Sequence, residues 1–425
     1  MRLQAFQFEL IPSEQQRGSL QCFAGACRFV FNKALEVQKR RFEGGDKYLG
    51  YPALCRLLTT WRHDPDTPWL KEAPTHPLQQ ALKNLDRAFA NFFAKRAGFP
   101  CFKKKGRRES FHYPDPQQIK LEQGNNRLFL PKLGWLRYRN SRPVLGTVRN
   151  VTVSLRAGRW SVSIQMERMD EPVTAIGSPV GVDMGIVRFA TLSDGGHLEP
   201  TNSFRRHEIA LRKAQQSMAR KVKYSRNWSK AKARVQRVHA RIANVRRDYL
   251  HKATTTISNN HAVVVVEELR VRNMTKSAAG TCAAPGKHVR AKSGLNKAIL
   301  DQGWFEFRRQ LAYKLAWRGG GLIAVPPHHT SQTCPACGVV SPENRRTQAV
   351  FSCIGCGYEN HADVVGAINI LRRGEAMMCS EGRDDARFAC VVNGAVRPSS
   401  AGTHLCAKSG QCAGDSAEGI PFLSA

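Results

Sequence analysis

The sequence predicts a mixed α+β protein of several domains, and three features support that class. Stretches that alternate apolar and polar residues predict strands at the start of the chain and again over 117–168. Stretches with apolar residues every three or four positions predict helices between and after these strands. Two Cys-x2-Cys pairs near the end of the patterned region indicate a metal-bound unit. A chain of 425 residues has room for two to four such domains.

The first part of the chain predicts a sheet with a helical domain inserted into it. Residues 1–11 have the pattern of one strand, and Ser13 with Gln16 can form a capping box that starts a helix. Apolar stripes then predict further helices, before the strand patterns return. Because the first strand can join the later ones, we predict a β-barrel over 1–11 and 114–175, with a helical domain over 12–113.

The overall charge predicts a polyanionic partner, most simply nucleic acid. Lys and Arg number 66 against 33 Asp and Glu, so the formal net charge is +33. The sequence has no apolar run of membrane length, and its first residues do not form a signal peptide. Thirteen cysteines, an odd number that includes the two close pairs, favour a reducing compartment over a disulfide framework. We therefore expect a cytoplasmic protein with no membrane partner.

Residues 99–113 combine basic and aromatic side chains. The basic residues are Lys103, Lys104, Lys105, Arg107 and Arg108. The aromatic residues, on both flanks, are Phe99, Phe102, Phe111 and Tyr113. Such a segment can contact phosphates with its cations while its aromatic rings stack on bases. A solvated surface loop is the simpler interpretation of an isolated run, so both interpretations stay open here.

Residues 203–252 form the most basic segment, with sixteen Lys and Arg against two acidic residues. An apolar seam recurs at steps of three and four, which predicts a long amphipathic helix with a basic face. A charge run is usually only a solvated face, but salt-bridged helices interleave both signs and this segment does not. The residues that we expect to contact nucleic acid here are Arg234, Arg237 and Arg241.

Three acidic residues lie at the ends or starts of predicted elements. Asp183 ends an apolar strand before a turn at Gly185, which is how RNase H-like folds begin. Glu267 ends a strand of four valines, and neighbouring Glu268 points to the opposite side of that strand. Asp363 opens a helical pattern, where by itself it would only be an N-cap. Together, three such carboxylates can hold two Mg²⁺ ions, which prefer hard oxygen ligands.

The two Cys-x2-Cys pairs predict a tetrahedral zinc site. Their cysteines are Cys334, Cys337, Cys353 and Cys356. Gly338 and Gly357 each follow the second cysteine of a pair, where the chain must turn sharply. Four protein ligands leave no open position on the metal for a substrate, so we expect a structural zinc.

Several blocks of the sequence together resemble one family. GVDMG, VVVVEELRVRNMT, SQTCPACG, CIGCG and HADVVGAINIL resemble the signature blocks of TnpB (OrfB), the insertion-sequence-encoded relative of type V CRISPR effector nucleases. FKKKGRRESFHYP and ANVRRDYLHK are similar to the same family, and the resemblance covers residues 1 to 373. It implies RNA-guided cleavage of double-stranded DNA, with a guide RNA made from the end of the element. It also implies structural Zn²⁺, catalytic Mg²⁺ and a monomer that associates with the nucleoid when DNA is bound.

The resemblance also implies an architecture and site residues. In that architecture, the predicted β-barrel is a wedge domain and the predicted helical domain is a recognition domain. Residues 176–330 and 357–373 form an RNase H-like (RuvC) domain, and a zinc ribbon is inserted in it over 331–356. Asp183 matches the first catalytic Asp, Glu267 the Glu and Asp363 the last Asp. Val365 stands where the family commonly has Asn. Residues 374–425 match nothing in the family, and their Gly/Ser/Ala-rich composition predicts a disordered tail.

Two other functions remain possible for such a sequence. One is a guided DNA-binding repressor whose cleavage site has decayed, and the other is a transposase, or an accessory protein of an insertion sequence. The presence of all three acids favours hydrolysis over repression. The basic surfaces and the zinc ribbon favour hydrolysis over strand joining. Copurification of a small RNA, followed by a test for Mg²⁺-dependent cutting, would separate the three.

Overall fold

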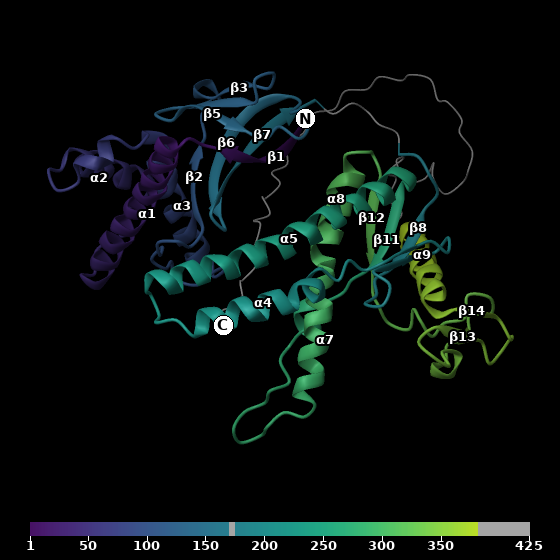
Figure 1. Ribbon diagram of the computed structural model, residues 1–425. Coiled ribbons are helices and arrows are strands. Elements are labelled where there is room, and N and C mark those ends of the chain that lie inside the picture. Colours follow the sequence, from purple (N-terminus) through teal and green to yellow (C-terminus); the bar gives the residue numbers. More distant parts are fainter. Residues whose placement is uncertain (170–174, 381–425) are drawn as a thin grey trace, which may run out of the picture.

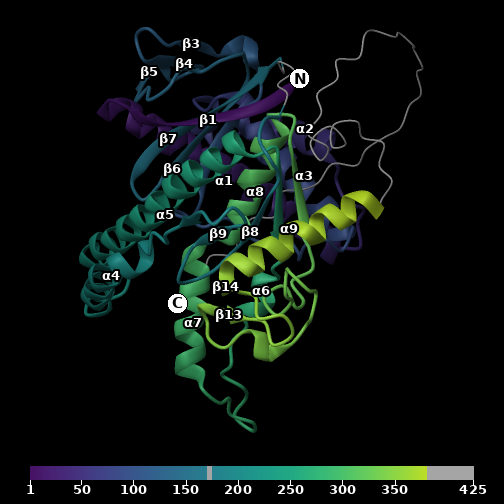
Figure 2. The ribbon, with the colours of Figure 1, turned by 90° about the vertical axis from the view of Figure 1, so that its right-hand side faces the viewer.

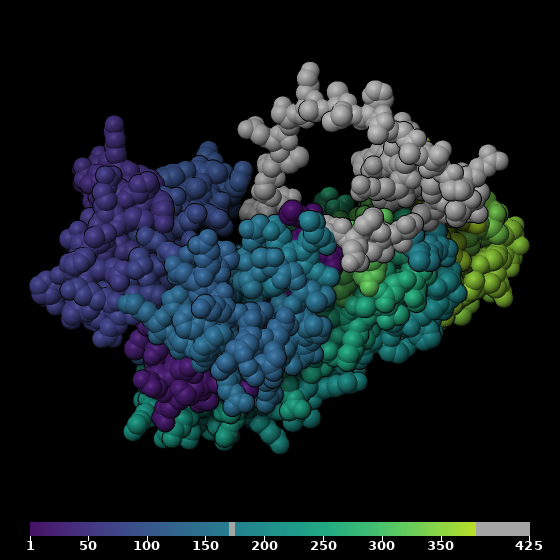
Figure 3. Space-filling view, turned by 90° about the horizontal axis from the view of Figure 1, so that it is seen from above, coloured from purple at the N-terminus to yellow at the C-terminus, as the bar shows by residue number. Residues whose placement is uncertain are grey.

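The computed structural model describes residues 1–169 and 175–380, which form two lobes. We refer to residues 1–169 as the N-terminal lobe and to residues 175–380 as the C-terminal lobe (Figure 1). Seen from above, the purple and blue residues of the N-terminal lobe lie at one end of the molecule and the yellow-green residues late in the chain at the other (Figure 3). Each lobe contains its own sheet with helices packed on it, so the prediction of a mixed α+β chain with more than one sheet is confirmed.

A seven-stranded sheet forms the centre of the N-terminal lobe, in the order β2-β6-β7-β1-β5-β4-β3. Its strands are β1 (Arg2–Ile11), β2 (Glu109–Tyr113), β3 (Lys120–Glu122), β4 (Arg127–Leu130), β5 (Gly134–Tyr138), β6 (Thr147–Arg156) and β7 (Arg159–Arg168). Strand β1 is antiparallel to β7, from Arg2 opposite Arg168 to Glu9 opposite Ser161, and its end pairs with β5. The first strand therefore joins the later ones across the helical segment, as the sequence predicted.

Strand β2 corrects one predicted boundary. The sequence assigned residues 12–113 to a helical domain, but Glu109–Tyr113 pairs with β6 at an edge of the sheet. Phe111 and Tyr113 are buried in the core, so the base-stacking interpretation that the sequence left open does not apply to these two rings. The short alternation of ESFHY is a strand pattern, and the basic run that precedes it obscured this pattern.

Three helices pack against this sheet and share one core with it. They are α1 (Glu14–Glu43), α2 (Tyr51–His63) and α3 (Thr75–Phe93), with short 3-10 turns at Pro68–Lys71 and Pro116–Gln118. The predicted capping box is present: Ser13 Oγ accepts from the Gln16 N–H at 3.2 Å, and the Gln16 side chain accepts from the Ser13 N–H at 3.1 Å. Phe6 and Phe8 of β1 contribute to the core that buries Leu20 and Val30 of α1.

A five-stranded sheet forms the centre of the C-terminal lobe, in the order β10-β9-β8-β11-β12. Its strands are β8 (Val180–Asp183), β9 (Ala190–Leu192), β10 (His197–Leu198), β11 (Val263–Glu267) and β12 (Gly321–Val325). Strands β8, β11 and β12 are parallel, whereas β9 returns antiparallel beside β8. The central strand β11 is buried along its whole length, as its four valines predicted.

The four valines of β11 divide between two helical layers. Val264 and Val266 share a core with residues of α5 (Arg226–Asn260) and α8 (Trp304–Ala316). Val263 and Val265, on the other face, share a core with α9 (Ala362–Ser380). Because side chains alternate along a strand, a run of valines can serve both layers. Figure 2 shows α9 in front of the strands, with α5 and α8 behind them.

Helix α9 lies unusually close to β8, and Gly181 makes this possible. A Cβ added at Gly181 would lie 2.1 Å from the Ala367 carbonyl oxygen of α9, which no side chain could tolerate. The glycine therefore permits direct contact between strand and helix backbones. This contact fixes where the first turn of α9 lies relative to the end of β8.

The remaining helices of the C-terminal lobe include a long basic hairpin. It consists of α4 (Ser203–Ala219) and α5, which pack through an apolar cluster that includes Leu211, Val235 and Ile242. The predicted seam is therefore confirmed, and the hairpin projects alongside the N-terminal lobe (Figure 1). Helices α6 (Val271–Met274) and α7 (Val289–Gln302) follow, and Gly303 separates α7 from α8.

The last described part of the chain contains the cysteine pairs and α9. We refer to residues 331–361, which contain the four cysteines, as the cysteine unit. Besides the cysteine turns, it contains two short strands, β13 (Val350–Ser352) and β14 (Glu359–His361), and a 3-10 turn at Pro342–Asn344. Helix α9 continues to Ser380, so the predicted disorder is wrong for residues 374–380, and the rest of that predicted tail lies outside the described residues. In the described part of the chain, none of the helices has the length and apolar character needed to cross a membrane.

Candidate active site and zinc site

Asp183 and Glu267 end neighbouring parallel strands at the same edge of the C-terminal sheet. Strands β8 and β11 are in register from Val180 opposite Val264 to Val182 opposite Val266. The residues that follow these pairs are the two acids. The Glu267 side chain is buried, with the residue 8% exposed, whereas Glu268 is exposed to solvent. The two neighbouring glutamates therefore differ in environment, and Glu267 is the buried one of the pair.

Asp363 lies in the first turn of α9, against the end of β8. A Cβ added at Gly366, one turn after Asp363, would lie 3.0 Å from Asp183 Oδ2. The start of the helix therefore packs directly on the Asp183 carboxylate. Val365, at the position where the family commonly has Asn, is buried in a core with Cys334, Phe351 and Cys353.

Glu267 and Asp363 lie close enough to Asp183 to affect its ionisation. Burial, and then the negative charges of Glu267 and Asp363, raise the pKa of Asp183 to about 7, while the Arg345 guanidinium opposes this rise. Burial also raises the pKa of Glu267, opposed by a hydrogen bond from Thr330 and by the charge of Arg373. Such a crowded acidic group, with hard oxygen donors from three separate elements, suits divalent cations such as Mg²⁺.

Two side chains at this site were not identified from the sequence. Arg345 Nη2 lies 3.8 Å from Asp363 Oδ1, and it comes from the unit that carries the cysteines. Thr330 Oγ1 donates a hydrogen bond of 2.7 Å to Glu267 Oε1. Arg345 sits in a basic pair between the two cysteine pairs, which was a weak signal of a role. Thr330 carries no local signal, because its partner lies 63 residues away.

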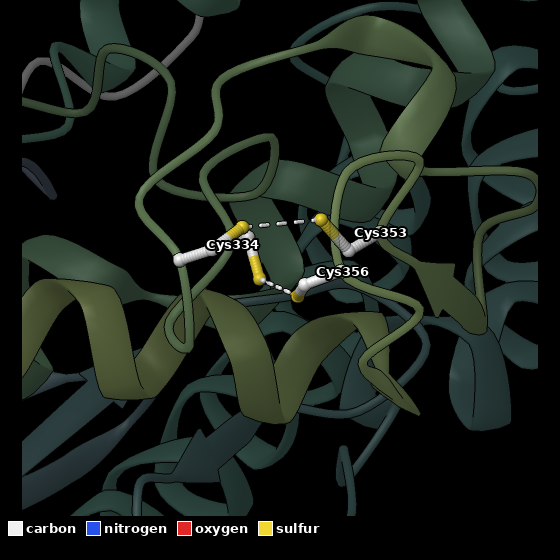
Figure 4. Close-up of side chains that lie close together, drawn as sticks. Cys334, Cys353 and Cys356 are labelled. Carbon is white, nitrogen blue, oxygen red and sulfur yellow. Dashed lines mark hydrogen bonds between the residues drawn. The ribbon is translucent and has the colours of Figure 1, made fainter.

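The four cysteines form a compact sulfur cluster, and their ligand atoms all lie within 4.8 Å of one another. Cys334 Sγ is 3.7 Å from Cys356 Sγ, and Cys337 Sγ is 3.5 Å from Cys353 Sγ. Figure 4 shows Cys334, Cys353 and Cys356 with their sulfur atoms directed toward one another. In the described residues, this is the one group of three or more potential metal ligands that is so close. The donor set and spacing fit a four-coordinate Zn²⁺.

Two tight turns and one buried asparagine shape the cysteine cluster. Gly338 and Gly357 have positive φ angles of 78° and 73°, and each donates its N–H to the carbonyl of the first cysteine of its pair at 3.0 Å. Asn344 is fully buried, donates to the Val339 carbonyl and accepts from the Ile354 N–H. It therefore ties the two turns together, a role that the sequence did not reveal.

The basic face predicted for the second helical region is exposed. Arg234, Arg237 and Arg241 all reach solvent from α5. Within the described part of the chain, none of these three forms an ion pair with a carboxylate. Farther along α5, burial lowers the pKa of Arg247. The nearby positive charges of Arg156 and Arg309 lower it further. Positive charge therefore continues toward the junction of the two lobes.

The basic run after α3 is also on the surface. Lys103, Lys104, Lys105 and Arg107 are exposed, and the Lys103 ammonium lies 4.0 Å from the centre of the Phe31 ring. Phe99 and Phe102 are 39% and 45% exposed, and Lys39 lies near both rings. Half of the predicted aromatic set is thus accessible, and the other half belongs to the core.

The fold is similar to that of a solved Cas12f1 structure. A solved structure titled "Cryo-EM structure of the Cas12f1-sgRNA-target DNA complex" matches with a TM-score of 0.50 at 13% sequence identity, covering 84% of this chain and 82% of that chain. At this identity the match shows the fold alone. The protein therefore has a Cas12f1-like fold.

The sequence comparisons identify the family. Family models match residues 161–278 ("Probable transposase", OrfB of IS605), 304–370 ("Cas12f1-like, TNB domain") and 1–47 ("Helix-turn-helix domain"). The chain is 55% identical over 382 residues to "Putative RNA-guided DNA endonuclease InsQ" of Escherichia coli K12, covering 89% of this chain and 94% of that protein. It is 37% identical over 385 residues to a "Putative RNA-guided DNA endonuclease" of Streptomyces pristinaespiralis, covering 89% and 91%. The chain belongs to the TnpB (OrfB) family of IS605-type insertion sequences.

One of the family models differs from the structure that it covers. Residues 1–47 match a model described as a helix-turn-helix domain. In the structure, they form strand β1 and the single long helix α1, which is separated from α2 by Gly44–Gly50. The strand lies inside a sheet, so this segment does not present two helices joined by a turn.

Proposed function

We propose that the protein is an RNA-guided DNA endonuclease that hydrolyses double-stranded DNA in a Mg²⁺-dependent reaction. The observation that carries this proposal is the meeting of Asp183, Glu267 and Asp363 from two strand ends and a helix start. Burial is the largest cause of the raised pKa of Asp183, and the negative charges of the other two acids are the next largest. The high identity to proteins described as RNA-guided DNA endonucleases supports the same activity.

Each acid has a defined part in this proposal. Asp183, Glu267 and Asp363 would hold the Mg²⁺ ions, which in such sites generate the attacking hydroxide and stabilise the leaving oxygen. Burial of Asp183 and Glu267 excludes water from one side of the site, so the charges act in a medium of low polarity. The Arg345 guanidinium faces Asp363 from the cysteine unit and can pair with a phosphate that enters the site.

The same proposal assigns the other regions. Residues 176–330 and 357–373 form a RuvC-type nuclease domain, and residues 331–356 form a ribbon with a structural Zn²⁺. The N-terminal sheet, with β2 and β3 as its edge strands, forms the wedge-type domain, and the helices inserted in it form a recognition domain. The exposed arginines of α5 and the basic run after α3 bind the guide RNA and the RNA–DNA duplex through phosphates. The protein acts as a monomer in the cytoplasm, at the nucleoid when DNA is bound.

The experiment is purification of the full chain, sequencing of the copurifying RNA, and a plasmid cleavage test with and without Mg²⁺. We expect a small RNA that derives from one end of the element, and cutting only at a plasmid site that matches its guide segment. Guided binding without cutting would instead indicate a repressor. Joining of strands without a guide would indicate a transposase.

A further inference from the structure

Glu267 owes its orientation to one buried hydroxyl group. The Thr330 hydroxyl donates to Glu267 Oε1 at 2.7 Å, while its other neighbour, the Pro327 carbonyl, is 3.5 Å away. Thr330 is only 5% exposed and Glu267 8% exposed, so water cannot readily replace this donor. The outer torsion of a glutamate side chain is broad, and the carboxylate needs a partner to hold one orientation. With Oε1 bound to the hydroxyl, Oε2 is left for another ligand.

Thr330 is itself held in place by α9. The Asn369 side-chain amide donates to the Thr330 carbonyl at 2.8 Å and to the Thr333 carbonyl at 2.7 Å. Asn369 is 7% exposed, and it lies on the same helix that carries Asp363. Arg373, one turn later, donates to the Pro326 carbonyl at 2.7 Å and to the His328 carbonyl at 2.8 Å. Residues 326–333 therefore follow the position of α9 closely.

We propose that Thr330 is a positioning residue for Glu267 and that Asn369 positions Thr330. The inference rests on the proposed function, in which Glu267 is a Mg²⁺ ligand. Helix α9 would then fix two of the three acids, Asp363 through its own backbone and Glu267 through Asn369 and Thr330. The chain enters the first cysteine turn directly after this segment, at Cys334, so an intact zinc unit also limits how far Thr330 can move.

Two substitutions at Thr330 separate the hydroxyl from the shape of the side chain. Thr330→Val keeps the volume and loses the donor, whereas Thr330→Ser keeps the donor and loses a methyl group. The matched control is Thr333→Val in the same segment, since the Thr333 hydroxyl donates to the His329 carbonyl and not to an acid. Asn369→Ala tests the second step, because it removes both amide hydrogen bonds to the segment.

The measurement is Mn²⁺ binding to the RNA-free full chain by electron paramagnetic resonance, with Asp183→Ala as the background. Partners that orient metal ligands typically contribute 10–100-fold in affinity, so we expect Thr330→Val to weaken binding about tenfold. Thr330→Ser and Thr333→Val should stay near the parent affinity, and Asn369→Ala should fall between. Guide RNA and target DNA binding, and a zinc content of one per chain, should not change in Thr330→Val.

Parent-like Mn²⁺ affinity in Thr330→Val would overturn the inference, as would an equal loss in Thr330→Ser. If Thr330→Val does not fold, Thr330→Ser and Thr330→Ala make the same test, because both lose the methyl group and only Ala loses the hydroxyl. Asp183→Ala separates this inference from the function on which it rests. If Asp183→Ala still cuts DNA and binds Mn²⁺, the proposed function fails. If it loses both while Thr330→Val keeps both, only the role of Thr330 fails.

Discussion

The zinc site and the acidic site lie on adjoining elements, but their ligands are brought together in different ways. The four cysteines lie within residues 334–356, in two turns closed by their own backbone hydrogen bonds. The acids span residues 183–363 and meet only because β8, β11 and α9 pack together. Local sequence therefore determines the first site, whereas the second depends on the tertiary structure of the C-terminal lobe.

The two sites also differ in how their charges are balanced. A zinc ion would compensate four thiolates directly, and the Asn344 side chain links the turns around them. Burial, and then the negative charges of Glu267 and Asp363, make ionisation of Asp183 costly in the metal-free protein, and its raised pKa reflects this cost. The first site should therefore contribute to folding, while the second should reduce stability until cations bind. Three predictions compare the two sites and a fourth concerns the basic face of α5, from the largest expected effect to the smallest.

Removing ligands of the zinc site should give the largest loss of folding stability. Cys334→Ser with Cys353→Ser takes one thiolate from each turn, and structural zinc sites contribute about 10 kcal/mol or more of binding free energy that is also folding free energy. We expect loss of stoichiometric zinc, measured by mass spectrometry of the metal, and loss of protection around α9 in hydrogen exchange. Zinc that persists at one per chain in the double variant would show that the cysteines are not its ligands.

Each acid should be essential for cutting and dispensable for binding. Asp183→Ala, Glu267→Ala and Asp363→Ala should each abolish cleavage, since a two-metal site that lacks one ligand loses on the order of several kcal/mol of transition-state stabilisation. Guided target binding should persist, because it rests on base pairing and on the basic surfaces. Plasmid cleavage and filter binding, run on the same preparations, measure the two separately.

Glu268→Ala is the matched control for the acids, because this neighbour of Glu267 is exposed on the same strand end. It should cut DNA at close to the parent rate. Loss of cutting in Glu268→Ala, with normal cutting in Glu267→Ala, would place the wrong glutamate at the site. Normal cutting in all four variants would show that the three acids are not catalytic.

Much of the fold was predictable wherever a pattern was local and long. The four valines of β11, the seam of α5 and the capping box at Ser13 all carry their signal within a few turns of chain. The errors arose where a short pattern lay inside a misleading context. Strand β2 follows a basic run, and residues 374–380 precede a Gly/Ser/Ala-rich tail, although Met377 and Met378 continue the apolar face of α9.

The three acids of the candidate site could be predicted from the sequence, but the side chains that contact and position them could not. Asp183, Glu267 and Asp363 could be found because each lies at an element boundary with a recognisable flank. Arg345 and Thr330 could not, because a side chain that contacts a distant residue leaves no periodic trace in its own segment. The closeness of α9 to β8 was equally hidden, since it depends on one glycine at residue 181.

The cost of the crowded acids should appear in the pH dependence of stability. The pKa of Asp183 rises from its ordinary 3.8 to about 7 on folding, so folding retains the proton between these values and stability falls as pH rises through them. Asp183→Asn cannot ionise, so its stability advantage over the parent in Mg²⁺-free buffer should grow from pH 4 to pH 7 and then stay level. Urea unfolding at several pH values measures this difference.

The control for this comparison is Asp66→Asn, which changes an exposed carboxylate in the N-terminal lobe. The difference in unfolding free energy between Asp66→Asn and the parent should not grow in this way between pH 4 and pH 7. An advantage of Asp183→Asn that is the same at pH 5 and pH 8 would mean that folding does not raise the pKa of Asp183 in solution. Added Mg²⁺ should reduce the advantage, because the ions stabilise the ionised parent and have less to bind in the variant.

The smallest of these effects should come from the basic face of α5, because many contacts share the binding of a nucleic acid. Arg234, Arg237 and Arg241 recur at steps of three and four, so they lie along one side of the helix. Each phosphate contact that is lost should lower the slope of log affinity against log salt by about 0.9 for a duplex and about 0.7 for a single strand. Replacing all three with Gln should therefore weaken RNA binding at low salt. It should also lower the slope by the contribution of two to three phosphate contacts. Replacement with Glu should weaken binding further, since it adds repulsion, and it should do so for unrelated RNA sequences as well as for the guide. Titrations at four salt concentrations measure the slope directly. A parent-like slope in both triple variants would mean that this face is solvated and that the guide RNA lies elsewhere on the protein.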